Sequence, residues 1–265
     1  MYKHRVLLII AVVSLLFLFL PLILIVITSF NSADTISIPL DGFSLMWFAR
    51  VFKSRSLVTS LKTSLLLALV ASLVGIVIGI FAAIALTRRP GKLSSFLLSL
   101  FLSPSLIPGI VIGYVLFQSI VVQLAIPLDA ALLIGHLLVV LPYTVRLLTA
   151  GLKECDVSIE EAARTLGCTP VKAFVKVVLP DLKPAFLSAF MLAFINSFNN
   201  IPVSMYLKGP GKNTLPYAMM NFIEYNYDPT VSALSVMLMG LTLVFMLIID
   251  RATTHKTKTK VQEEV

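Results

Sequence analysis

Six long apolar blocks dominate this sequence and limit the folds that it can adopt. They cover approximately residues 6–28, 63–86, 96–122, 130–149, 184–206 and 231–249. A helical stretch of about 20 apolar residues matches the thickness of a lipid bilayer. Only 13% of the 265 residues are charged, which is about half of the usual share in a soluble domain. The sequence therefore predicts an all-α membrane protein with six transmembrane helices in a single domain, residues 1–265.

The first block follows Lys3 and Arg5, so a signal peptide has to be considered. Its apolar core is longer than that of a signal peptide, and no small-residue cleavage motif follows it closely. We therefore expect the first block to be a retained transmembrane helix.

Basic residues give the chain a formal net charge of +8. Most of them lie in loops beside apolar blocks, where an excess of Lys and Arg marks the cytoplasmic side. The richer side holds the N-terminus, loops 88–92 and 146–183, and the tail from Arg251. Both termini and the segment 151–183 are therefore predicted to be cytoplasmic. This placement explains the positive charge, so nucleic-acid binding is not predicted.

The first loop on the opposite side is an exception, because it also carries several basic residues. Its segment FSLMWFARVF, Phe43–Phe52, places Phe43, Met46, Trp47 and Val51 near one helical face. This pattern predicts an amphipathic helix that lies at the outer membrane interface.

The string GIVIG occurs twice, at residues 75–79 and 109–113. Two glycines four positions apart let helix backbones approach closely. Both strings are interpreted as packing faces, either within this subunit or against a partner.

The segment SIEEAARTLGCTPVKAFVKVVLP, residues 158–180, is charged and interrupted, unlike its surroundings. Ser158 and Glu161 fit a capping box at the start of a helix. Gly167 would end that helix, and Thr169-Pro170 would start another. An apolar stripe, Val171, Phe174, Val175 and Val178, marks the second helix. Helix rules leave two alternatives open: a docking element, or a helix pair lying on the membrane.

The spacing of Glu161-Ala162-Ala163, Gly167, Val177 and Leu179-Pro180 resembles the EAA loop of binding-protein-dependent ABC importer permeases. The chain is most similar to the second permease of spermidine/putrescine-type importers. Further matching positions are Asn31, Gly42-Phe43, Trp47-Phe48, Ser103-Pro104, His136, Leu141-Pro142, Gly209-Pro210 and Leu215-Pro216. The resemblance implies the type I ABC importer permease fold in the bacterial cytoplasmic (inner) membrane.

In that family, two permeases form a heterodimer above an ATPase dimer, and an extracytoplasmic solute-binding protein delivers the cargo. The resemblance implies that loop 151–183 inserts into the ATPase. The candidate coupling residues are Glu160, Glu161, Ala162, Ala163, Leu166 and Gly167. This chain has no Walker A pattern. ATP and Mg²⁺ are therefore expected on a partner subunit, with no cofactor in this chain.

Polar or broken stretches within the apolar blocks suggest a substrate pathway. Prolines and a glycine interrupt residues 103–109, and backbone freed inside a membrane must be buried or line a cavity. Amides cluster near the end of the fifth block, where they are costly unless they face partners or water. The candidate pathway residues are Ser103, Ser105, Tyr114, Asn196, Asn199 and Asn200. A packing kink is the alternative at 103–109, and His136 is interpreted as a packing residue rather than a proton relay.

The cargo stays open at this point. Similar polyamine permeases carry acidic residues where Ser105, Asn199 and Asn200 stand here, and a polycation would normally need such carboxylates. The candidate cargoes are therefore a polyamine, an aminophosphonate, ferric iron, or a sugar-like or anionic metabolite. The loop 207–230, together with the first outer loop, is predicted either to dock the binding protein or merely to connect helices. The tail 251–265 is expected to be solvated.

Two other functional classes fit the sequence less well. An ion-driven secondary transporter is expected to carry intramembrane carboxylates or an inverted repeat, and neither is evident. A membrane-embedded enzyme is disfavoured because no paired carboxylates, HExxH motif or serine/histidine set occurs. Cys155 and Cys168 lack metal-binding spacing, so both are expected to be free thiols.

Overall fold

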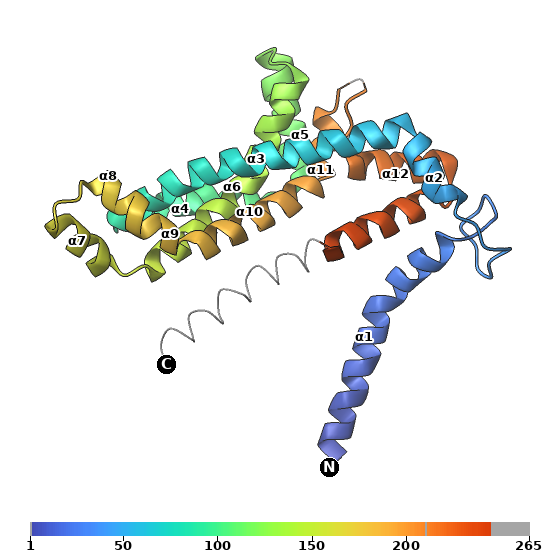
Figure 1. Ribbon diagram of the computed structural model, residues 1–265. Coiled ribbons are helices and arrows are strands. Elements are labelled where there is room, and N and C mark those ends of the chain that lie inside the picture. Colours follow the sequence, from blue (N-terminus) through green and yellow to red (C-terminus); the bar gives the residue numbers. More distant parts are fainter. Residues whose placement is uncertain (1, 210, 245–265) are drawn as a thin grey trace. The chain divides into compact units, whose positions relative to one another are not determined.

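The computed structural model describes residues 2–209 and 211–244 (Figure 1). Within these ranges the chain is helical and forms no β-strand, which confirms the prediction of an all-α protein. The described residues divide into two compact units. The first combines the residues up to Val58 with those from Met219 onward, and the second is Thr59–Ala218.

The first unit contains α1 (Tyr2–Thr28), α2 (Met46–Lys53), most of α12 (Leu215–Asn226) and a final helix, Thr230–Val244. The apolar side chains of α1 face outward, and Phe17 is 77% exposed. A helix with such a surface needs lipid or another apolar protein around it. The predicted first block, 6–28, is therefore confirmed as one long apolar helix.

The second unit is built around α6 (Leu128–Glu154). Val140, Val145 and Leu148 of this helix are fully buried. The other long helices are α3 (Arg55–Arg88) and α10 (Lys183–Phe198), and Figure 1 shows both running beside α6. Shorter elements are α4 (Lys92–Leu102), η1 (Ser103–Leu106), α5 (Gly109–Leu116), η2 (Phe117–Gln123), α7 (Val157–Thr165), α8 (Pro170–Ala173), η3 (Phe174–Val178), α9 (Leu179–Asp181) and α11 (Pro202–Leu207).

Three of the described helices are long and apolar enough to cross a membrane: Arg5–Thr28 within α1, α3 and α6. Two bent pairs raise the possible number of crossings to five. The predicted sixth block, 231–249, corresponds to the helix Thr230–Val244 as far as it is described. Residues 245–249 and the predicted tail, 251–265, lie outside the described residues.

The third predicted block, 96–122, is not one continuous helix. Lys92–Leu106 and Gly109–Gln123 meet at an angle of 98°. Pro108 lacks a backbone N–H, and it forces Ile107 into extended backbone at φ −92° and ψ 132°.

The fifth block, 184–206, also divides, because α10 ends at Phe198 and α11 begins at Pro202. A second bend, of 69°, separates Pro170–Asp181 from Lys183–Phe198, just where this block begins.

Two local predictions need correction. The interfacial helix begins at Met46 instead of Phe43, because Phe43 pairs with Asn31 in an isolated bridge and stacks on Phe30. Only Trp47 and Val51 of the predicted face are buried. The segment 207–230, predicted as an outer loop that either docks the binding protein or connects helices, contains the 12-residue helix α12. The apolar and aromatic residues of α12 outweigh the Gly, Pro and Asn residues on which the loop prediction rested.

The two GIVIG strings pack against helices of this same subunit. An added Cβ at Gly79 would lie 2.9 Å from the hydroxyl of Thr144 in α6. At Gly113 it would lie 2.8 Å from the backbone oxygen of Pro202 and 3.1 Å from Cα of Val203 in α11. These contacts leave no room for a side chain, so packing within the subunit is confirmed for both strings.

We expect Gly113→Ala to destabilise the protein, since backbone atoms of α11 cannot move aside as a side chain would. Overpacking of this kind costs about 1–3 kcal/mol. The thermal unfolding midpoint in detergent should fall by several degrees. Gly240→Ala is the matched control, because an added Cβ there meets no atom within 4 Å. Equal stability of the two variants would contradict the close contact between α5 and α11.

Candidate functional site

Asp156, and not Ser158, caps the start of α7. The Asp156 carboxylate accepts a hydrogen bond of 2.9 Å from the Ser158 N–H, and this bond lowers the pKa of Asp156. The predicted capping box of Ser158 and Glu161 is therefore wrong. Aspartate caps a helix as well as serine does, and Asp156 already has the extended backbone that a cap requires.

The other ends of the helix pair agree with the sequence analysis. Gly167 has φ +91° and comes directly after Leu166, the C-cap residue of α7. The N–H of Gly167 donates to Arg164, and that of Cys168 donates to Ala163, which is the Schellman pattern. The Thr169 hydroxyl caps α8 by accepting from the Lys172 N–H, with Pro170 at the first helical position. A rigid corner thus separates α7 from α8.

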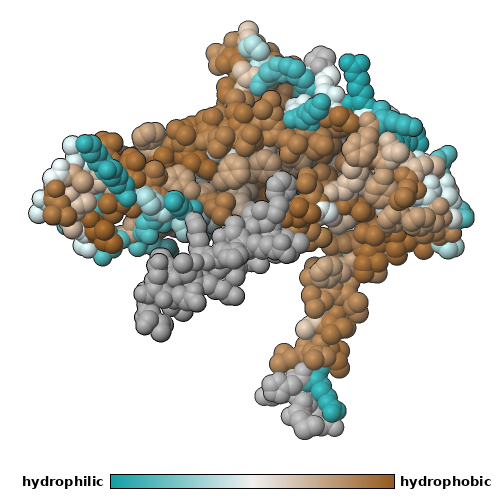
Figure 2. All heavy atoms as spheres, in the orientation of Figure 1, coloured by the Kyte–Doolittle hydropathy of each residue, from teal (hydrophilic) through white to brown (hydrophobic). Residues whose placement is uncertain are grey.

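The candidate coupling residues lie on different faces of α7. Glu161, Ala162 and Leu166 are exposed, and Leu166 is 87% exposed. Ala163 is half-buried, whereas Glu160 is buried. Figure 2 shows hydrophilic residues gathered at this end of the second unit, in contrast to the apolar surface of its long helices. Exposed small and apolar side chains beside a glutamate give this end of α7 a surface suited to another protein.

Glu160 forms an ion pair with Arg88, the last residue of α3. Sequence reasoning missed this pair, because 72 positions separate its members and no pattern links them. Arg88 also lies 6.0 Å from the centre of the Phe174 ring. The pair brings the end of a long helix into contact with the helix pair.

The predicted apolar stripe of the second helix is only partly buried. Val178 is buried and Phe174 half-buried, but Val171 and Val175 are exposed. The π-helical turns of η3 change the residue period, so a stripe drawn at the α-helical period does not stay on one face.

Cys155 lies beside this element and lines a cavity of about 360 Å³ with Ile159, Val178 and Asp181. Burial raises the pKa of the Cys155 thiol to about 11, and a hydrogen bond to Asp181 adds to the effect. The thiol is therefore protonated at neutral pH. Both cysteines are free, as predicted.

The serines of the candidate pathway sit at the bend between α4 and α5. The hydroxyl of Ser103 donates to the Leu100 oxygen at 2.8 Å, and that of Ser105 donates to the Leu102 oxygen at 2.7 Å. Tyr114 is exposed on α5 and makes an edge contact with Tyr206, with ring centres 5.9 Å apart. The bend thus satisfies its own hydroxyls and leaves an aromatic surface next to it.

The three asparagines have different surroundings. Asn196 donates to the Leu192 oxygen at 2.8 Å, within α10. Asn200 accepts from the Val203 N–H at 3.0 Å and so satisfies the start of α11. Asn199 is exposed, and its side chain forms no hydrogen bond among the described residues. Of the three, Asn199 is the one whose side chain is exposed and not engaged by another described residue.

His136 is fully buried in α6 between two hydroxyls. Its Nδ1 lies 2.8 Å from Ser197 Oγ, and its Nε2 lies 3.0 Å from Ser204 Oγ. Ser204 donates its own hydrogen to the Asn200 oxygen at 2.7 Å. The network therefore assigns the ring proton to Nε2, with Nδ1 accepting from Ser197. A ring with both nitrogens satisfied supports the interpretation of His136 as a packing residue.

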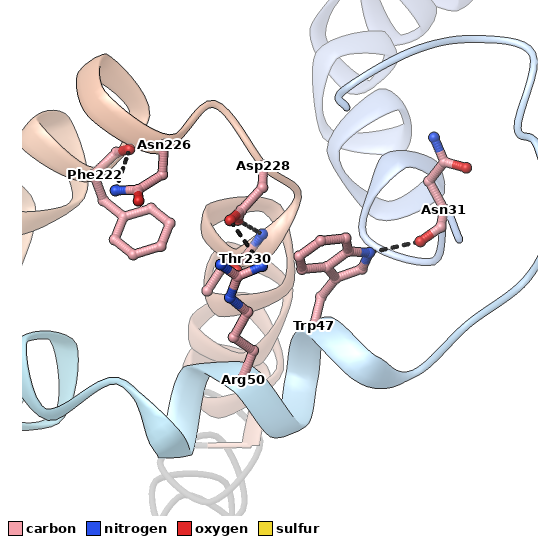
Figure 3. A network of polar contacts seen from close by, with 7 residues as sticks. All are labelled: Asn31, Trp47, Arg50, Phe222, Asn226, Asp228 and Thr230. Carbon is pink, nitrogen blue, oxygen red and sulfur yellow. Dashed lines mark hydrogen bonds and ion pairs between the residues drawn. The ribbon is translucent and has the colours of Figure 1, made fainter. Parts of the chain in front are cut away.

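A second polar network links the two segments that were predicted to lie outside (Figure 3). The Trp47 ring N–H donates to the Asn31 oxygen at 2.6 Å. Arg50 lies over the Trp47 ring and pairs with Asp228 at 3.2 Å. Asp228 also accepts from the Thr230 N–H at 2.9 Å, at the start of the final helix. Residues near α2 and near the end of α12 therefore share one polar cluster.

Sequence comparisons identify similar proteins over most of the chain. A family model described as the binding-protein-dependent transport system inner membrane component matches residues 75–256. The putrescine transport system permease protein PotI of Escherichia coli K12 is 28% identical over 231 residues, covering 84% of this chain and 82% of that protein. The spermidine/putrescine permease PotC of the same organism is 30% identical over 245 residues, covering 91% of each.

Solved structures share the fold. A chain of a bacterial ABC transporter that imports alginate has a TM-score of 0.65 at 18% identity, covering 94% of this chain and 98% of that one. A chain of the methionine transporter MetNI in an inward-facing conformation has a TM-score of 0.56 at 24% identity, covering 73% and 92%. The chain therefore shares its fold with chains of these two ABC transporters.

We expect Asp156→Ala to loosen the first turn of α7, because its N–H groups lose their side-chain acceptor. Hydrogen exchange of the amides at 158–161 should become roughly fivefold faster. Asp156→Asn should retain the cap. Since folding lowers the pKa of Asp156, the charged cap is complete above the ordinary aspartate pKa and is lost as the pH falls through the lowered value. Exchange that is unaffected by Asp156→Ala would refute this capping role.

Proposed function

The chain belongs to the binding-protein-dependent transport system inner membrane component family, the permeases of ABC importers, and from this premise we propose its role. It forms the membrane pathway through which a small solute, handed over by an extracytoplasmic binding protein, enters the cytoplasm. A dimer of ATPase subunits supplies the energy and binds ATP and Mg²⁺. A second permease subunit completes the pathway as a heterodimer. The protein would reside in a bacterial cytoplasmic membrane.

The exposed face of α7 is the observation that carries the ATPase-coupling proposal. The side chains of Glu161, Ala162 and Leu166 are exposed, and the Schellman turn at Gly167 fixes how the helix ends. A capped helix with small and apolar outward residues can insert into a groove of a partner as a rigid body. We therefore retain loop 151–183 as the coupling element, with Ala163 at the edge of its contact surface.

The membrane topology is also a proposal. We assign six crossings, with the bent pair Lys92–Leu106 and Gly109–Gln123 as the third, the block 184–206 as the fifth, and both termini in the cytoplasm. The helix Thr230–Val244 would begin the sixth crossing. The positions of the lysines and arginines support this arrangement, because the 88–92 and 151–183 segments then share the cytoplasmic side. The whole chain, 1–265, is treated as one permease domain.

For the solute pathway, we propose the bend at Ser103 and Ser105, the neighbouring Tyr114, and the polar residues Asn196 and Asn199. Asn200 would act indirectly, since its side chain holds the start of α11. Non-helical backbone at membrane depth is tolerated where it lines a cavity or is buried in protein. The backbone is non-helical at both 107–108 and 199–201. Tyr114 is exposed on α5, the helix that follows the first of these breaks.

A polyamine-like solute is the first cargo to test, because PotI and PotC are named for putrescine and spermidine. Ser105, Asn199 and Asn200 are uncharged, so we assign selection of a cation to the binding protein more than to these positions. The shared outer cluster of Asn31, Trp47, Arg50 and Asp228 supports a joint docking surface for that protein.

Replacing Gly167 should separate ATP hydrolysis from transport. Valine at φ +91° is strained, whereas asparagine accepts positive φ more readily. An added Cβ meets no atom within 4 Å, so the effect is confined to the corner itself.

In proteoliposomes that contain the complete transporter, Gly167→Val should reduce uptake roughly tenfold while the subunit stays inserted, and Gly167→Asn should keep most of it. If Gly167→Val leaves both uptake and stimulated ATPase activity unchanged, α7 is not the coupling helix.

The cargo assignment can be tested on the cognate binding protein by calorimetry with putrescine, spermidine, 2-aminoethylphosphonate and ferric iron. We expect saturable binding of a polyamine, and the bound solute should stimulate ATP hydrolysis by the assembled transporter. Binding of the aminophosphonate or of iron, with no response to either polyamine, would replace the cargo assignment and leave the permease assignment intact.

A further inference from the structure

The ion pair between Arg88 and Glu160 joins the end of α3 to the helix α7. Arg88 Nη2 contacts Glu160 Oε2, and the Arg88 guanidinium lies 6.0 Å from the centre of the Phe174 ring in η3. A single side chain of α3 therefore contacts both arms of the helix pair. In Figure 1, α7 and α8 lie beyond the C-terminal end of α3.

The two partners of this pair differ in exposure. The Glu160 side chain is 8% exposed and that of Arg88 is 42% exposed. Glu160 Oε1 is buried and has no hydrogen-bond partner within the described part of the chain. A buried carboxylate is unfavourable unless a cation compensates it. Because Arg88 is the cation paired with Glu160, the buried position of Glu160 depends on α3.

The remaining contacts of α7 show why this link matters. α7 packs on α8 and η3, which belong to the same loop. Its connection to α6 runs through Cys155 and Asp156, two residues with extended backbone. A short extended linker transmits movement poorly compared with a side-chain contact into a long helix. Arg88 thus provides a second, direct connection from the helix pair to a membrane-crossing helix.

We propose that Arg88 and Glu160 are positioning residues that make α3 move together with α7 during the transport cycle. This inference rests on the proposed function, in which an ATPase acts on α7. The adjacent acidic residues then divide the work: Glu161 faces the ATPase, and Glu160 holds the helix to the subunit. Arg88 and Glu160 touch no solute and act only through the movement of the two helices.

The neighbouring Arg89 provides a matched control. It is exposed, it follows α3 directly, and it forms no ion pair with any described residue. Reversing the charge of Arg89 changes the net charge of this segment by the same amount as reversing that of Arg88, but it breaks no ion pair between helices. A difference between the two sites therefore reports the ion pair and not the charge of the loop.

The test uses the complete transporter in lipid nanodiscs, with MgATP and orthovanadate as the probe, so that no solute needs to be known. Hydrogen exchange of residues 80–88 is measured with and without the probe, together with ATPase co-purification and activity. The variants are Glu160→Gln, Arg88→Glu, Glu160→Arg, the double reversal R88E/E160R, and Arg89→Glu. Glu160→Gln keeps the side-chain shape and guards against loss of folding.

In the wild type, the probe should change exchange at the end of α3. Glu160→Gln and both single reversals should reduce that change at least threefold, while the ATPase still co-purifies with each variant. The double reversal should restore the response, and Arg89→Glu should leave it intact. A merely structural pair would alter basal exchange without altering this response.

An undiminished response in Glu160→Gln and Arg88→Glu would overturn the proposal, as would a double reversal that restores nothing. Loss of ATPase association in every single variant would overturn it too, because the pair would then serve docking. If the wild-type chain itself associates with no ATPase, the proposed function fails before any variant is compared. The two failures are therefore distinguishable.

Discussion

Close packing of small residues around α6 is the contact on which the second unit depends. Ala71 and Ala83 of α3, and Ala189 and Ala193 of α10, are fully buried next to Val140 and Leu148. In lipid, apolar side chains gain little by leaving their solvent, so helices associate through close van der Waals contact. Alanine and glycine allow that contact because their backbones can approach. Any movement of α6 is therefore shared with the helices on both sides.

The helix breaks depend on a second constraint, the need to satisfy every backbone group away from water. The side-chain oxygen of Asn200 accepts from the Val203 N–H at the start of α11, and the backbone oxygen of Asn200 accepts from the Ser204 hydroxyl. Ser204 in turn contacts His136, which also contacts Ser197. The chain of hydrogen bonds runs from the break at 199–201 into the centre of α6. The break at 199–201 is thus tied by hydrogen bonds to the buried centre of α6.

Local features of this fold were predictable from sequence, and contacts between distant segments were not. Gly167 and Thr169-Pro170 were identified correctly because glycine at positive φ and a threonine cap act within a few residues. The cap at Asp156 was missed because Ser158 offered a competing pattern. The prolines and the glycine at 103–109 correctly indicated a break in the block 96–122, although the 98° angle of that break was not predictable from them. The prediction that Val171, Phe174, Val175 and Val178 share one buried face was wrong, because the π-helical turns in η3 change the number of residues per turn.

The pair Glu160-Glu161 shows most clearly what a motif omits. Consecutive residues of an α-helix point about 100° apart, so two adjacent glutamates can have different surroundings. Sequence reasoning placed both among the coupling residues, whereas the structure buries Glu160 against Arg88 and exposes Glu161. The acidic side chain that faces inward has a different physical requirement from its neighbour, namely a cation at a fixed distance. If α7 couples to an ATPase as proposed, it needs an anchored inner face as well as an outer contact surface, and the ion pair of the buried Glu160 with Arg88 provides part of that anchor.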